Sequence, residues 1–181
     1  MSSTDIPAGF RIDAIPRMIL EEIWSTGCDP FGNTIEVMVN EEAESAPLRC
    51  CLKEATVGEA VGLIAYGPLD KPGPYAEVGP VFIHPTPCNG YEEPYRYPVD
   101  FRHRRQVLRV YDGAGPMLYD LNRIVEGDEA EAAIATVLQD PRAAVVHSRN
   151  VVAGCYMFAI RRTQHGSGPL TMPSGNSFPS Q

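Results

Sequence analysis

The stretch that decides the fold is QVLRVYDG, residues 106–113. Its side chains alternate, so Leu108 and Val110 share the face that we expect to be buried in a core. The Asp112-Gly113 pair is typical of a tight turn, and extended sequence resumes at residues 117–125. We therefore predict a β-hairpin here, and antiparallel pairing as the main organisation of the chain.

Outward from this hairpin, the sequence predicts two helices. The first covers residues 16–26, since it opens with a proline and is followed by Gly27, which suits a helix end. The second covers residues 128–139, where Asp128 and Glu131 have the spacing of a capping box. Both segments carry an apolar stripe at helical spacing.

Short apolar or alternating segments predict the strands. Pro80 lies inside one of them, and because proline cannot donate a hydrogen bond to a neighbouring strand, that strand lies at a sheet edge or begins near the proline. The predicted strands cover residues 10–12, 34–40, 60–66, 77–84, 106–111, 117–125, 143–147 and 155–161. This order favours an α+β fold with a single, mostly antiparallel sheet of about six to seven strands.

Length and charge bound the number of domains and the partners. The chain has 181 residues and becomes rich in Gly, Pro and Ser near its end, so we expect one domain, residues 1–162, and a flexible tail, residues 163–181. Its 15 Lys and Arg against 23 Asp and Glu give a net charge of −8, which disfavours nucleic acid as a partner. No stretch resembles a membrane helix or a signal peptide, so we expect a cytoplasmic protein without membrane association.

The cysteines and glycines bear on redox state and cofactors. Five cysteines at irregular spacing predict free thiols, at Cys28, Cys50, Cys51, Cys88 and Cys155. No glycine-rich phosphate loop follows a predicted strand, so we expect no nucleotide cofactor and assign no other.

Three sequence motifs stand out from the rest of the chain. They are RCCL at residues 49–52 followed by Gly58-Glu59, PYAEVGPVFIH at residues 74–84, and HSRN at residues 147–150 followed by Gly154-Cys155-Tyr156. Over residues 9–162 the chain thereby resembles the bacterial family catalogued as domain of unknown function 1203. That family has no assigned activity, so the resemblance implies a shared fold and a compact pocket without naming a reaction.

The resemblance includes one departure at the first motif. In the family this motif often holds two cysteines separated by two residues, whereas Cys50 and Cys51 are adjacent here and position 48 is Leu. The departure argues against a metal site or a disulfide at this motif.

The main candidate for catalysis pairs His147 with Cys155, because a nearby histidine favours the thiolate that a cysteine nucleophile needs. A loop over residues 148–154 would place His147 opposite Cys155, whereas a loop one residue shorter would place it opposite Tyr156. The sequence leaves both registers open. Cys51 is the alternative nucleophile, and in the structural alternative these residues only fill and satisfy the core.

Four further residues complete the predicted site. Arg109 would anchor an anion, and Asn150 would orient His147 or donate to an oxyanion. Tyr111 and Glu77 would contact the ligand. We therefore predict a protein that handles a small molecule, for which the arginine points to an anion, in a pocket beside the residue 85–98 loop. The alternative is a non-catalytic binding or protein-interaction module.

A metal site is the weaker alternative. His84 and Cys88 could bind a metal together with Cys50 or Cys51, but zinc sites typically show two tight ligand pairs and this sequence has one loose pair. Adjacent cysteines on a strand point to opposite faces, so both can serve one site only at a bulge or a turn. We therefore predict no metal ligand.

Overall fold

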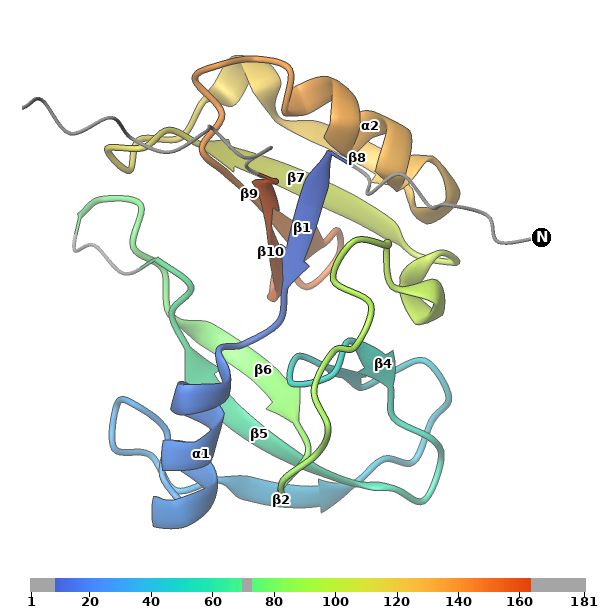
Figure 1. The fold of residues 1–181 in the computed structure, drawn as a ribbon. Helices are drawn as coiled ribbons and strands as arrows, with labels where there is room; N and C mark the ends of the chain where they lie inside the picture. The colour runs from blue at the N-terminus through green and yellow to red at the C-terminus, as the bar shows by residue number, and fades with distance from the viewer. Residues whose placement is uncertain (1–8, 70–72, 164–181) are drawn as a thin grey trace, which may run out of the picture.

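The first of two sheets joins the two ends of the described chain (Figure 1). The computed structural model describes residues 9–69 and 73–163. The strands of this sheet are β1 (Phe10–Asp13), β7 (Arg105–Tyr111), β8 (Arg123–Glu126), β9 (Val145–Asn150) and β10 (Tyr156–Arg162). Their order is β1-β10-β9-β7-β8, and every neighbouring pair is antiparallel.

The second sheet is built from the segment between β1 and β7. Its strands are β2 (Glu36–Val39), β3 (Pro47–Leu48), β4 (Lys53–Glu54), β5 (Ala60–Tyr66) and β6 (Gly79–Ile83). Their order is β2-β5-β6-β3-β4, and the pairs are antiparallel except for β3 with β6. In that parallel pair Leu48 lies opposite Phe82.

The helices are α1 (Arg17–Thr26) and α2 (Ala130–Val137), with short 3-10 turns η1 (Val99–Phe101), η2 (Tyr119–Leu121) and η3 (Gly127–Glu129). As predicted, α1 ends at Gly27, whose φ of 72° is readily adopted only by glycine. Figure 1 shows α2 covering the first sheet and α1 lying against the second.

The buried side chains form two clusters, one for each sheet with its helix. Strand β10 contributes to both, because Phe158 and Ile160 pack in the first cluster while Ala159 packs in the second. The rings of Tyr66 and Tyr156, 5.4 Å apart, also join the two sheets. Helix α2 therefore covers one face of the first sheet, and the cluster of the second sheet packs against the other face.

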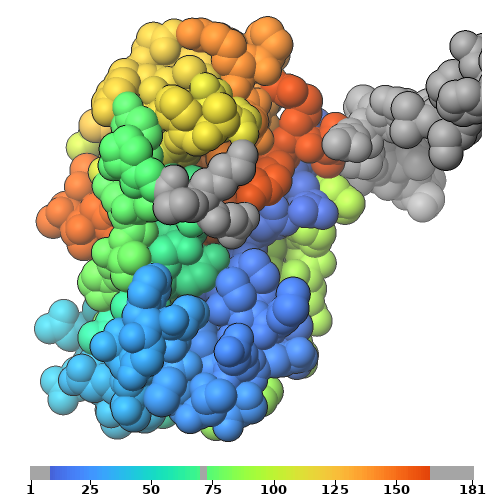
Figure 2. All heavy atoms as spheres, turned by 90° about the vertical axis from the view of Figure 1, so that its left-hand side faces the viewer, coloured from blue at the N-terminus to red at the C-terminus, as the bar shows by residue number. Residues whose placement is uncertain are grey.

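Loops extend this junction along one side of the molecule. Figure 2 shows the green segment before β6 lying against the yellow loop that follows β7. Within this contact the rings of Tyr75 and Tyr119 are 6.3 Å apart.

The predicted α+β class, the two helices and the mostly antiparallel pairing are confirmed. The prediction of one sheet with about six to seven strands is wrong, because the chain forms two sheets of five. The two sheets separate because β1, the first described strand, pairs with β10, the last described strand, in the first sheet. Strands β2 to β6 are left to pair among themselves.

Two predicted strands differ in detail. Strand β6 begins at Gly79, one residue before Pro80, and it lies between β5 and β3, so the alternative of an edge strand is wrong. Its partner β3 is only two residues long and pairs at Phe82, so the missing N–H of Pro80 is not required there. The predicted hairpin is present, but its second strand begins only at Arg123 because η2 lies in the connecting loop.

The predicted capping box of the second helix is wrong. Asp128 lies in η3, and the helix has no side-chain cap. The Glu131 carboxylate instead accepts hydrogen bonds from the Tyr97 backbone N–H and the Arg102 guanidinium, both at 2.8 Å. A tertiary contact has replaced the local one.

The predicted tail lies outside the described residues, apart from Thr163. Within the described ranges, the helices fall short of the length and apolarity that a membrane span requires.

Candidate metal centre

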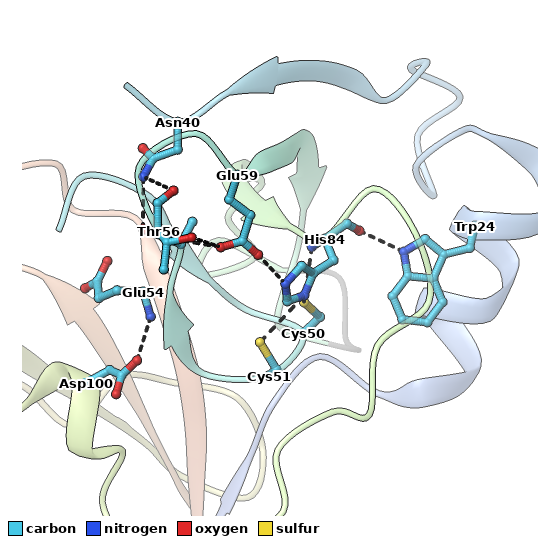
Figure 3. A network of polar contacts seen from close by, with 10 residues as sticks. Trp24, Asn40, Cys50, Cys51, Glu54, Thr56, Glu59, His84 and Asp100 are labelled. Carbon is cyan, nitrogen blue, oxygen red and sulfur yellow. Dashed lines mark hydrogen bonds and ion pairs between the residues drawn. The ribbon is translucent and has the colours of Figure 1, made fainter. Parts of the chain in front are cut away.

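Three thiols and one imidazole converge at the end of the second sheet. The Sγ atoms of Cys50, Cys51 and Cys88 and a ring nitrogen of His84 all lie within 4.8 Å of one another. Nδ1 of His84 is 3.3 Å from Cys50 Sγ and 3.7 Å from Cys51 Sγ (Figure 3). Each of these atoms is a good ligand for a borderline or soft transition metal.

The parallel pairing of β3 with β6 brings the first cysteine to the histidine. Leu48 lies opposite Phe82, so Cys50 and His84, each two residues further on, emerge side by side. Backbone pairing continues past Leu48, because the Arg49 N–H donates to the Phe82 carbonyl at 2.8 Å, and the His84 N–H donates to the Cys50 Sγ at 3.2 Å. Cys50 is therefore placed by the register of the sheet.

A tight turn brings the second cysteine to the same histidine. Residues 49–52 connect β3 to β4, and the Leu52 N–H donates to the Leu48 carbonyl at 2.9 Å. Leu52 has φ 56°, a left-handed conformation that is uncommon for a bulky side chain. On a strand, two adjacent cysteines would point to opposite faces, but this turn lets both of them serve one site. Both thiols contact His84.

A carboxylate holds the histidine from behind. Nε2 of His84 is 2.9 Å from Glu59 Oε1, and Glu59 Oε2 accepts from the Thr56 N–H at 2.8 Å and the Thr56 hydroxyl at 3.0 Å. The Trp24 indole N–H donates to the His84 carbonyl at 2.8 Å, as Figure 3 shows. Glu59 thus fixes the orientation of the imidazole, with Nδ1 left facing the thiols, and Trp24 holds the backbone of His84.

Two of the four residues of the cluster are buried, His84 and Cys88 are partly exposed, and the cluster is strongly polarised. Cys50 is 1% exposed and Cys51 4% exposed. A hydrogen bond from Cys50, followed by one with His84, lowers the pKa of Cys51, while the bond to Cys51 raises the pKa of Cys50. The contact with Cys51 raises the pKa of His84 to about 9. Burial opposes ionisation of Glu59, but its hydrogen bonds with Thr56 and His84 lower its pKa overall.

The family model described as Protein of unknown function (DUF1203) matches residues 45–162, more than half of the chain, and this range includes all four residues of the cluster. The chain belongs to the DUF1203 family. The match begins later than residue 9, where the resemblance in the sequence was expected to start. No curated protein and no solved structure matches the chain.

In this DUF1203 protein the predicted catalytic pair does not form. His147 lies opposite Ala159 of β10, so neither predicted register, with Cys155 or with Tyr156, is present. The reason is that β9 continues to Asn150, which shortens the loop, and the pairing with β10 shifts at a bulge after Tyr156.

His147 is instead enclosed by aromatic rings. It is fully buried, with ring centroids 4.8 Å from Tyr111 and 5.3 Å from Tyr156, and neither ring nitrogen has a hydrogen-bond partner among the described residues. Burial, followed by the charges of Arg149, Arg161 and Arg109, lowers its pKa to about 3. It lines a cavity of about 310 Å³ together with Tyr111.

The predicted anion anchor is occupied by a carboxylate of the protein. Nη1 of Arg109 donates to both carboxylate oxygens of Glu77 at 2.9 Å, and Nη2 of Arg149 lies 2.6 Å from Glu77. Arg109, Glu77 and Cys155 line one cavity of about 250 Å³. Asn150 takes no part, because its Oδ1 accepts from two backbone N–H groups of the β9–β10 turn.

Two residues of these sites were not singled out as functional from the sequence. Glu59, which contacts His84, is 25 residues from it in the sequence. Arg49, which contacts Cys155, is 106 residues from that cysteine. No local spacing reveals contacts over such separations. Both residues do lie in motifs that carry the family resemblance, and this was the one available signal. The ligand set that the sequence analysis set aside is the one that the fold brings together.

Proposed function

We propose that this protein binds one zinc ion through Cys50, Cys51, His84 and Cys88. The observation that supports this proposal is the convergence of four ligand atoms within 4.8 Å of one another. Tetrahedral zinc with three sulfur ligands and one nitrogen ligand places these atoms roughly 3.5 to 3.8 Å apart. Small side-chain shifts therefore suffice to close the cluster around the ion.

The surroundings of the cluster favour zinc in two ways. Backbone N–H groups point at the thiols, from His84 to Cys50 and from Lys53 to Cys51, and such bonds stabilise thiolates. The Glu59 carboxylate accepts from the ring nitrogen of His84 that faces away from the thiols. A carboxylate behind a histidine ligand is a common arrangement at zinc sites, where it fixes the tautomer and raises ligand basicity.

The arrangement is that of a structural zinc site. Four protein ligands leave no open coordination position for a substrate or an activated water. The ion would join the β3–β4 turn to the segment after β6. That segment is also attached to α1, since Arg17 donates to the Cys88 carbonyl at 2.6 Å and Trp24 to the His84 carbonyl.

Thiol catalysis at the same cluster is the alternative. Cys51, His84 and Glu59 have the order of a nucleophile, a base and an orienting carboxylate. Cys51, however, is 4% exposed and lines none of the cavities of about 310, 740 and 250 Å³. The low exposure of Cys51 makes it a poor nucleophile and favours a metal.

A small-molecule role is a separate proposal. A cavity of about 740 Å³ is lined by Tyr156 and Ala159 of β10 and by Tyr91 and Tyr95 of the residue 85–98 loop. We propose this cavity, which lies beside the residue 85–98 loop, as the place where a small-molecule ligand would bind. A catalytic and a purely binding role are equally compatible with this cavity.

Cobalt substitution tests the zinc proposal. The chelator-treated protein, titrated with Co²⁺, should bind one equivalent with a thiolate-to-metal charge-transfer band and the visible bands of tetrahedral cobalt, and one equivalent of Zn²⁺ should bleach both. Cys88→Ser should weaken the charge-transfer band and the affinity, whereas Cys28→Ser, outside the cluster, should change neither. Binding without a charge-transfer band, or no stoichiometric binding, would overturn the proposal.

A further inference from the structure

A buried arginine, Arg49, contacts the sulfur of Cys155, the residue directly before β10. Arg49 is 1% exposed, and its Nη2 lies 3.0 Å from Cys155 Sγ. Its other donors reach backbone carbonyls, with Nε 2.7 Å from the Tyr156 oxygen and Nη1 bonded to Pro47. The guanidinium is therefore held rigidly against the sulfur.

The charge of this arginine needs a counterion. Arginine stays protonated in proteins, and a buried charge is costly unless an opposite charge accompanies it. None of the ion pairs within residues 9–69 and 73–163 includes Arg49. The carbonyls that it contacts are neutral. The Glu54 carboxylate favours this charge from nearby but is paired with Arg104. Among the described groups that Arg49 contacts directly, only the Cys155 sulfur can become an anion.

Cys155 also lines a cavity whose wall includes Arg149, an arginine with one nitrogen that is unpaired among the described residues. Cys155 lines the cavity of about 250 Å³ together with Arg149, Arg109 and Glu77. Arg149 is 6% exposed, and its Nε has no hydrogen-bond partner in the described part of the chain. The wall of the cavity carries two guanidinium groups, Arg109 and Arg149, and one carboxylate, Glu77, so its net charge is positive. Arg49, which contacts the sulfur from outside the lining, adds a further positive charge.

We propose that Cys155 is a nucleophilic thiol in an anion-selective site, which takes small electrophiles that carry a carboxylate. The Cys155 sulfur, in contact with the Arg49 guanidinium, attacks an electrophilic carbon. The S–C bond forms as the bond to the leaving group breaks, the leaving group departs with the electron pair, and the thiol proton is released to solvent. The reagent's carboxylate is held by the arginines of the cavity wall. The observations that support this proposal do not depend on the zinc proposal.

Two alkylating reagents of nearly equal size test the proposal. Native protein with zinc added is treated with iodoacetate or with iodoacetamide, and each cysteine is quantified separately by mass spectrometry. Cys28, which is also partly buried and pairs with Thr34, is the internal reference. The iodoacetate-to-iodoacetamide rate ratio should be about tenfold higher at Cys155 than at Cys28, and the excess should shrink as salt is added.

Two substitutions in the cavity wall should act in opposite directions. Arg109→Gln should slow iodoacetate at Cys155 several-fold and leave iodoacetamide unchanged, whereas Glu77→Gln should accelerate iodoacetate. A merely structural effect would move both reagents together. Equal rate ratios at Cys155 and Cys28, or no labelling of Cys155 before denaturation, would overturn the proposal with the wild-type protein alone.

Discussion

Nε2 of His84 lies 2.9 Å from Glu59 Oε1 while Nδ1 of the same ring lies 3.3 Å from Cys50 Sγ. The imidazole is thus placed between a carboxylate and a group of thiols, with one nitrogen committed to each side. A metal ligand needs this division, because the nitrogen that binds the ion must carry no proton.

Glu59→Gln should weaken zinc binding about 10- to 100-fold, because the neutral amide supports the imidazole less strongly than the carboxylate. The measurement is competition for zinc against a chromogenic chelator of known affinity. Glu42→Gln removes an exposed carboxylate elsewhere and is the matched control. An unchanged affinity in Glu59→Gln would show that this contact does not serve the metal.

Zinc should stabilise the fold. An ion that binds only the native state at a free concentration 100 times its dissociation constant raises the free energy of unfolding by about 2.7 kcal/mol. Urea denaturation with buffered zinc and with chelator measures this difference. Cys88→Ser should lose most of it and Cys28→Ser should retain it. A midpoint that ignores zinc in the wild type would contradict a structural role for the ion.

His147 should make the protein sensitive to acid. Its pKa is lowered to about 3 by burial, against about 6.5 when unfolded, so below pH 6.5 the unfolded chain binds a proton that the native state refuses. Stability is therefore complete above pH 6.5 and is lost progressively toward pH 3, by about 1.5 kcal/mol between pH 6.5 and pH 5.

Urea denaturation of wild type and His147→Leu at these two pH values isolates this effect. A chelator is present throughout, so that metal release does not contribute. The variant should lack about 1.5 kcal/mol of the decline that the wild type shows. Parallel declines in the two proteins would mean that His147 takes up its proton in the folded state.

Gly127→Ala should destabilise the protein by about 1 to 3 kcal/mol, because a Cβ there would lie 2.6 Å from the Phe101 carbonyl oxygen. Gly113→Ala is the matched control, since its Cβ would meet only the Ala144 Cβ at 4.0 Å. Thermal denaturation measures both. Equal melting temperatures for the two variants would show that the η1 and η3 segments separate easily.

Local patterns in the sequence predicted local structure well. The helix α1 lies close to where the flanking Pro16 and Gly27 indicated, and the strands β5 and β7 lie close to where the hydrophobic periodicity indicated. These signals act within a few residues. The division into two sheets was not predictable in this way. It depends on the pairing of β1 with β10, the first and last described strands, and no spacing in the sequence specifies a pairing between segments so far apart.

The candidate site was predictable only in its ingredients. His84 and Cys88 could be named as a loose ligand pair, but adjacency of Cys50 and Cys51 counted against them. Only the left-handed conformation of Leu52 and the parallel register of Leu48 with Phe82 turn that adjacency into convergence. Neither feature has a sequence signature, since leucine rarely adopts that conformation and parallel pairing requires distant segments.

The turn at residues 49–52 has a wider consequence. It carries Arg49, which contacts Cys155, directly beside Cys50 and Cys51, which face His84. An ion that fixes this turn would also fix the guanidinium at the distant sulfur. Thermodynamic coupling between two sites is reciprocal, so alkylation of Cys155 would in turn alter the affinity for the metal. If both proposals hold, the two sites form one linked system, in which metal binding alters thiol reactivity and alkylation of the thiol alters metal binding.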